Sequence, residues 1–229
     1  MRVLAQARLP NLKLPKGRFR LDPSPIYRKI IHLLTLKVYR PTYIGMEHIP
    51  ADGPAIIICN HVSYMDGPII DAGCGRRVRY LIDQDIFNYP VVHYLMSLNR
   101  SIPIAYNRKA VEKAFDEISE GLRAGDVICI FPEGSLTHTG SLGRFRPGIE
   151  FILRRDPVPV IPMAISGLWG SAFSRKYRKS HFRWWPRQWG RKVTVVCGAA
   201  IEPEKVTVNY LQEMVLKLKY SISEEHPAP

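Results

Sequence analysis

Two side chains able to move a proton lie in the segment 59–66, which reads CNHVSYMD and directly follows the apolar run 55–58. The imidazole of His61, with a free pKa of about 6.5, is suited to take a proton from a hydroxyl near neutral pH. If a helix begins at Val62, Asp66 lies a little over one turn from His61, where its carboxylate can orient one ring nitrogen. A His-x4-Asp spacing alone is weak evidence, because the chain contains seven histidines.

A second polar turn follows another apolar run, since residues 128–131 read ICIF and residues 132–135 read PEGS. Ligands of open α/β sheets bind beyond the carboxyl ends of strands. The turn therefore brings Glu133 and free backbone N–H groups to the sheet edge at which His61 is expected. Two polar turns after two buried strands fit one shared site better than two independent turns.

Other chemistries that use the same residues have less support. A hydrolase triad of His61 and Asp66 with Ser63, Ser135 or Ser141 lacks the G-x-S-x-G elbow. A metal site built from His61, Asp66 and Glu133 lacks the His-x3-His or paired-cysteine spacing, so no metal is expected. Neither a G-x-G-x-x-G nor a Walker loop is present, so nucleotide binding of those types has no phosphate cradle.

The elements that must position these turns alternate between short β-rich runs and helical stretches. Strands are predicted over residues 55–59, 78–82, 101–105, 127–131, 158–165 and 193–197, and helices over 90–98, 110–124, 145–154 and 206–222. This alternation predicts an α/β fold with a mainly parallel, covered sheet and helices on both faces. The length of 229 residues suits one such domain, which we expect over residues 41–229.

Composition restricts the partners and the compartment. With 46% hydrophobic and 23% charged residues the chain must bury a core, and its net charge of +13 favours anionic partners. The four cysteines have no zinc spacing, so free and mostly buried thiols in a reducing compartment are expected. No run of about 18 apolar residues or export signal occurs, so any membrane contact is expected to be peripheral, at the cytoplasmic face.

Residues 1–40 form a basic arm with ten lysines or arginines and a single acid, Asp22. Within this arm, residues 26–39 carry apolar side chains at helical spacing and predict a basic, amphipathic helix. Two interpretations stay open for that helix. It docks on the core of its own domain, or it lies in a bilayer interface.

The segment 168–192 gathers all four tryptophans and eight basic residues without an acid, the tryptophans being Trp169, Trp184, Trp185 and Trp189. Indole rings interleaved with cations suit the headgroup zone of an anionic membrane, which is the contact that we expect. The same composition suits single-stranded nucleic acid, and it also suits tryptophans that pack under a long loop. A basic membrane-binding or nucleic-acid-binding module without catalysis is therefore the alternative function.

The motifs resemble those of the glycerolipid acyltransferases, typified by bacterial 1-acylglycerol-3-phosphate acyltransferase. Asn60 and His61 with Asp66 match the first motif, and residues 131–134, FPEG, match the third. Residues 101–104, SIPI, and 160–163, VIPM, lie where the second and fourth motifs belong. Order and spacing agree over about residues 41–198. The stretch 131–170 is most similar to the acyltransferase halves of fused lysophospholipid transporter–acyltransferase proteins.

The resemblance implies an O-acyltransferase of phospholipid biosynthesis. Its acyl donor would be acyl-CoA or acyl carrier protein, used as co-substrate without a cofactor. Its acceptor would be the free hydroxyl of a lysophospholipid or of 1-acylglycerol-3-phosphate, with no specific nucleic-acid partner. By the same resemblance His61 is the general base and Asp66 orients it. The residues expected to bind substrate are Glu133, Gly134, Ser135, Arg146, Arg144 and Arg100.

The chain departs from the family at two positions that affect the expected substrate. Relatives that use lysophosphatidic acid usually carry an arginine two residues after the glycine of the third motif and another after the strand of the second motif. Leu136 takes the first place, and Ala105 or Tyr106 takes the second. A phosphomonoester needs a bidentate cationic clamp more than a phosphodiester headgroup does, so the choice between these acceptors stays open.

Overall fold

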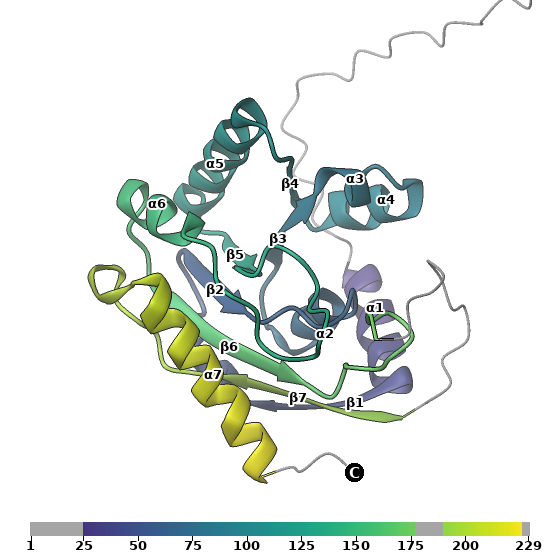
Figure 1. The fold of residues 1–229 in the computed structure, drawn as a ribbon. Coiled ribbons are helices and arrows are strands. Elements are labelled where there is room, and N and C mark those ends of the chain that lie inside the picture. The colour runs from purple at the N-terminus through teal and green to yellow at the C-terminus, as the bar shows by residue number, and fades with distance from the viewer. Residues whose placement is uncertain (1–24, 177–189, 226–229) are drawn as a thin grey trace, which may run out of the picture.

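The computed structural model describes residues 25–176 and 190–225 and has the predicted α/β architecture (Figure 1). The strands are β1 Tyr39–Ile44, β2 Ala55–Cys59, β3 Val78–Asp83, β4 Ile102–Ile104, β5 Val127–Ile130, β6 Val160–Ser166 and β7 Arg191–Cys197. The α-helices are α1 Pro25–Val38, α2 Asp66–Gly73, α3 Gln84–Phe87, α4 Pro90–Leu98, α5 Arg108–Arg123, α6 Gly148–Arg155 and α7 Val208–Glu225. Short 3-10 turns cover Met46–His48 and Pro203–Lys205. Every predicted strand and helix is present, with ends within about three residues of the prediction.

The strands form one sheet in the order β1-β7-β6-β2-β5-β3-β4. All neighbours run parallel except β6 and β7, which are antiparallel, so the prediction of a mainly parallel sheet is confirmed. Every residue of β2 and β5 is buried. Continuous burial is what a central parallel strand requires when helices cover both faces of its sheet.

The two faces of the sheet contribute to two separate cores. Along β2, Ile57 packs in the core shared with α2, whereas Ile56 and Ile58 pack in the core shared with α5, α6 and α7. Successive side chains of a strand point to opposite faces, so a five-residue apolar strand supplies both cores. Helices α1 and α2 lie on one side of the sheet and α5, α6 and α7 on the other (Figure 1).

Helix α1 leads directly into β1, an edge strand that pairs with β7. The sequence YRPTYI does not predict this strand, because it contains a proline, which a strand tolerates at the edge of a sheet. Tyr39 is buried in the core, so the sheet already includes residues on the amino-terminal side of the expected boundary at 40/41.

Helix α1 docks against α2, and Val38 at its end packs against the core. The His32 Nδ1 atom lies 3.0 Å from the Ala72 carbonyl oxygen, and Thr35 is buried. Ile30 and Leu33, by contrast, are 49% and 63% exposed and face outward rather than packing on the core. None of the helices in the described part of the chain combines the length and apolar character needed to span a bilayer.

Candidate active site

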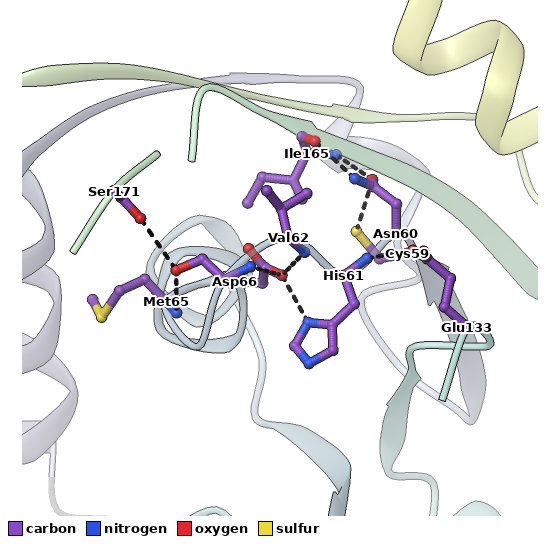
Figure 2. Close-up of polar contacts among 10 residues, drawn as sticks. Cys59, Asn60, His61, Val62, Met65, Asp66, Glu133, Ile165 and Ser171 are labelled. Carbon is purple, nitrogen blue, oxygen red and sulfur yellow. Dashed lines mark hydrogen bonds and ion pairs between the residues drawn. The ribbon is translucent and has the colours of Figure 1, made fainter. Parts of the chain in front are cut away.

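The two polar turns meet at the carboxyl edge of the sheet because β2 and β5 are adjacent and parallel. Their register pairs Ala55 with Val127 and Ile58 with Ile130, so the strands end side by side. The backbone N–H of His61 donates to the Glu133 Oε1 atom at 2.7 Å (Figure 2). The predicted convergence of His61 and Glu133 is therefore confirmed.

Asp66 holds the loop that carries His61. Its Oδ2 atom lies 2.8 Å from His61 Nδ1 and also accepts the backbone N–H groups of Val62, at 2.7 Å, and Ser63, at 3.0 Å. Asp66 is completely buried and is the first residue of α2. The helix thus begins at Asp66 and not at Val62, and the dyad forms because the 61–65 turn folds back over the carboxylate.

This geometry fixes the role of each ring nitrogen of His61. Since Asp66 Oδ2 accepts, Nδ1 carries the hydrogen and Nε2 is left as an acceptor that points away from the dyad (Figure 2). The ring stacks on Phe131 with centroids 4.1 Å apart and planes inclined by 14°. Its side chain is 19% exposed, so solvent reaches it.

Asn60 fastens the same loop to the neighbouring strand. Its side-chain amide donates to the Ile165 carbonyl at 3.0 Å and accepts from the Ile165 N–H at 2.8 Å (Figure 2). Asn60 is buried, so this pair of hydrogen bonds replaces water on both sides. On the other flank, the Tyr64 N–H donates to the Phe173 carbonyl, and Ser63 Oγ lies 3.4 Å from Ser171 Oγ.

Both carboxylate oxygens of Glu133 are taken by backbone donors. Oε1 accepts the N–H of His61 and Oε2 accepts that of Gly143, each at 2.7 Å. Burial raises the pKa of Glu133, and these two N–H donors partly offset that rise. The carboxylate therefore ties the loop bearing His61 to the 135–144 loop, rather than standing open to a ligand.

The remainder of the turn forms an exposed rim. Gly134 has a φ of +70°, and a Cβ there would lie 2.7 Å from Arg146 Nε, so the glycine permits both the turn and the close approach of Arg146. The Arg146 guanidinium carbon lies 5.7 Å from the centroid of the Tyr106 ring. The Tyr106 hydroxyl donates to the Gly134 carbonyl at 3.2 Å, while Ser135 is exposed.

Two cavities adjoin this rim, of about 550 and 250 Å³. Glu133 and Arg144 line both of them, Arg146 lines the larger and Ser135 the smaller. Within the described ranges, no group of three or more His, Cys, Asp or Glu side chains is arranged to hold a metal ion.

Comparison with known proteins agrees with this arrangement. The acyltransferase family model matches residues 40–166, more than half of the chain, and this match includes both polar turns. The chain belongs to the acyltransferase family. The crystal structure of the 1-acyl-sn-glycerophosphate acyltransferase PlsC from Thermotoga maritima shares the fold, with a TM-score of 0.69 and 21% identity over 89% of this chain and 81% of that one.

Curated relatives extend the comparison to sequence. The chloroplastic 1-acyl-sn-glycerol-3-phosphate acyltransferase BAT2 of Brassica napus is 27% identical over 131 residues, which are 56% of this chain and 38% of that protein. A probable 1-acyl-sn-glycerol-3-phosphate acyltransferase of Mycoplasma pneumoniae is 22% identical over 206 residues, 85% of this chain and 73% of that protein. The match to the first of these relatives thus spans well under half of its length.

Two predicted site residues, Arg100 and Trp169, and the departure from the family pattern at Leu136 have places in the structure that the sequence does not reveal. Arg100 precedes β4, which runs parallel to β3, so it lies at the amino edge of the sheet, opposite to His61. Its carbonyl accepts a hydrogen bond from Arg79 there. Leu136 is 2% exposed and packs inward, and Trp169 is half-buried against the core. Trp184, Trp185 and Trp189 lie outside the described residues.

The sequence analysis missed the contributions of Phe131, Gly143 and Tyr106. Phe131 belongs to the quoted FPEG motif, but its stacking on His61 follows only from the strand direction. The N–H of Gly143 carries no side-chain signal at all. The expectation of free, buried thiols is confirmed at all four cysteines, Cys59, Cys74, Cys129 and Cys197.

Proposed function

We propose that this protein transfers a fatty acyl group from a thioester donor, acyl-CoA or acyl carrier protein, to the free hydroxyl of a lysophospholipid or 1-acylglycerol-3-phosphate. The observation that carries the proposal is the His61–Asp66 pair, which leaves Nε2 of a partly exposed imidazole free to accept a proton. Membership of the acyltransferase family and the activities for which the curated relatives are named support the choice of reaction.

In the proposed reaction, His61 Nε2 takes the proton of the acceptor hydroxyl as that oxygen attacks the thioester carbonyl carbon. The new ester C–O bond forms, the C–S bond breaks, and the imidazolium returns its proton to the leaving thiolate. Asp66 stays ionised and stabilises the imidazolium through Nδ1. No acyl-enzyme is required, because the donor is already activated and the site supplies proximity and proton removal.

The exposed rim is the proposed substrate-binding region. Gly134 and Ser135 lie next to the carboxylate that holds His61, and Arg144 and Arg146 follow in the same loop. Arginine side chains in this place suit the phosphate groups that both proposed substrates carry. Arg100 does not belong to this region, because it lies at the opposite edge of the sheet.

A peripheral position on the cytoplasmic face of an anionic membrane is the second part of the proposal. On α1, Ile30, Leu33 and Leu36 are 49%, 63% and 42% exposed, and the exposed Lys29 and Lys37 flank them. An outward apolar stripe beside lysines suits a bilayer interface, where each cation near an anionic surface contributes about 1 kcal/mol. The segment 168–192 would add to this contact through Trp184, Trp185 and Trp189, since Trp169 packs against the core.

The activity is tested by incubating the protein with a panel of lysophospholipids and either acyl-CoA or acyl-loaded carrier protein, measuring free thiol and diacyl product. His61→Ala is expected to lower turnover by about 10² to 10⁴ if His61 is the general base. His93→Ala, at an exposed histidine of α4, is the matched control and should keep the wild-type rate. Equal rates for His61→Ala and wild type would remove His61 from the mechanism.

Membrane contact is tested separately by flotation with anionic and neutral liposomes. Leu33→Glu places a charge in the outward stripe and is expected to release the protein from anionic vesicles without unfolding it, since Leu33 is 63% exposed. A Trp184→Ala/Trp185→Ala double variant tests the second segment. Normal binding by Leu33→Glu would exclude α1 as the membrane contact.

A further inference from the structure

The 135–144 loop binds the backbone of His61 on both sides. The Thr137 N–H donates to the His61 carbonyl at 2.9 Å. On the other side, the His61 N–H donates to Glu133, and the second oxygen of that carboxylate accepts the Gly143 N–H. The peptide groups before and after His61 are therefore both bound, one directly by the loop and one through Glu133. The place of the imidazole thus depends on the shape of this loop.

Thr137 closes the loop into a compact turn. Its Oγ1 atom donates to the Ser141 carbonyl at 2.8 Å and accepts the Gly140 N–H at 3.1 Å. The Thr137 side chain is buried, so these hydrogen bonds replace contacts with water. Because the same residue closes the turn and binds the His61 carbonyl, a displacement of the turn at Gly140 also displaces the hydrogen bond to His61.

Two side chains from other parts of the fold contact this turn at Gly140. Lys219 of α7 donates from Nζ to the Gly140 carbonyl at 2.8 Å. The indole of Trp169 packs directly on the glycine, since a Cβ at Gly140 would lie 2.8 Å from the ring. Gly140 has a φ of +85°, so the absence of a side chain permits both the backbone conformation and the close approach of the indole.

Both contacting side chains are anchored in the sheet. Trp169 packs against the core, and its carbonyl accepts a hydrogen bond from Arg191 of β7 at 2.9 Å. Lys219 is half-buried on α7, which packs on β6 and β7 (Figure 1). The turn is therefore fastened to the rigid part of the domain rather than to another loop.

Lys219 also compensates the charge of Glu133. Burial raises the pKa of Glu133, and the positive charge of Lys219 is one of the influences that oppose this rise. Burial lowers the pKa of Lys219, and the Glu133 carboxylate opposes that change. The ammonium group thus favours the ionised carboxylate, which is the form that accepts the two backbone N–H groups at once.

We propose that Lys219, together with Trp169, is a positioning residue for His61. The two side chains fasten the 135–144 loop at Gly140 and thereby hold the backbone that carries the imidazole. The inference rests on the proposed acyl transfer for the role of His61 as the base. It extends the site to the carboxyl-terminal helix α7, which acts through the loop and contributes no group to the reaction itself.

Lys219→Met tests this role, because it removes the ammonium group and keeps an unbranched side chain of similar length. Initial rates against both substrates should show kcat lowered by about 10-fold or more, as expected for one hydrogen bond to a charged group. The KM values should stay within about threefold of wild type. A higher KM at unchanged kcat would overturn the proposal, because the loop would then serve substrate binding and not the alignment of His61.

Lys217→Met is the matched control, since Lys217 lies on the same helix, is exposed and pairs only across the surface with Glu213. It removes the same charge and should leave kcat and KM within about twofold of wild type. A loss of kcat equal to that of Lys219→Met would contradict the proposal, because net charge would then explain both results.

Hydrogen exchange measured by mass spectrometry provides a readout that needs no turnover. In Lys219→Met, peptides that cover residues 59–64 and 137–143 should exchange about 10-fold faster, whereas peptides of α5 should exchange as in wild type. Gly140→Ala disturbs the same turn from the side of Trp169 without changing charge, and it should give the same local pattern.

Unchanged exchange of residues 59–64 in both variants would overturn the proposal, and so would faster exchange throughout the chain, which a general loss of stability produces. If wild type is inactive but the two variants still show the local pattern, acyl transfer is rejected and the fastening of the loop by Lys219 and Trp169 stands.

Discussion

Replacing Glu133 by glutamine distinguishes two roles for a residue that the family resemblance assigns to substrate binding. In the structure its two oxygens accept the N–H groups of His61 and Gly143, each at 2.7 Å. Glutamine has nearly the same shape but offers one acceptor, so its NH₂ must face one of these two N–H groups. Glu133→Gln therefore breaks one contact and weakens the other without opening a cavity in the core.

The size of the effect follows from the number and type of hydrogen bonds. A hydrogen bond to a charged group contributes about 1.5–3 kcal/mol and a neutral one about 0.5–1.5 kcal/mol, so losing one charged bond and making the other neutral costs about 2.5–4.5 kcal/mol. If all of this free energy is lost from the positioning of His61, kcat falls by about 70- to 2,000-fold. If it appears as lost stability, Tm falls by about 5–18 °C for a chain of this length.

The assay is a set of initial rates against acceptor concentration, with released thiol as the readout, together with a thermal unfolding curve. A positioning role predicts that kcat falls while the KM for acceptor stays within about threefold, since the reactive geometry is lost and the rim is retained. A higher KM at unchanged kcat would refute the reasoning and return Glu133 to the acceptor site. Asp83→Asn is the control, because Asp83 also accepts a backbone N–H after a strand, that of Asp85.

Three further outcomes are expected. Asp66→Asn keeps an oxygen for the Val62 and Ser63 N–H groups and removes the charge beside His61. The value of kcat should therefore fall by about 10-fold, which is less than for His61→Ala. A wild-type rate would contradict the proposed His61–Asp66 dyad. Gly134→Ala forces a side chain into the left-handed region and against Arg146, so the free energy of unfolding should drop by about 1–3 kcal/mol in urea titrations. Burial raises the pKa of Cys59 and Cys129 well above the usual value and that of Cys197 to about 12. A thiol reagent at pH 8 should therefore react only slowly with the native protein, whereas all four cysteines should react quickly once the protein is denatured.

The parts of the site that the sequence predicts are those determined by strand direction. Residues that follow two buried, parallel strands must lie at one edge, and this places His61 beside Glu133 before any side chain is oriented. The apolar runs at 55–58 and 128–131 are unambiguous, because strands covered on both faces tolerate little polarity. The family match over residues 40–166 agrees with that prediction.

The parts that the sequence does not predict depend on backbone groups and on which end of a strand a loop occupies. The N–H of Gly143 determines what Glu133 can do, yet any residue at that position would supply it. Arg100 stands close in sequence to β4 but at its amino end, so it faces away from the site. In α1, helical spacing identifies an apolar stripe but does not say whether that stripe faces the core or the solvent.

The two departures from the family pattern acquire a physical meaning in this fold. Leu136 is buried and Tyr106 bonds the Gly134 carbonyl, so neither place offers a cation to a substrate. The arginines that line the two cavities, Arg144 and Arg146, approach from the far side of Glu133 instead. A phosphate bound there would be separated from His61 by the Glu133 carboxylate, which accepts the backbone N–H of His61. The position of Glu133 would thus set both the alignment of the base and the distance between the reacting hydroxyl and the charged end of the substrate.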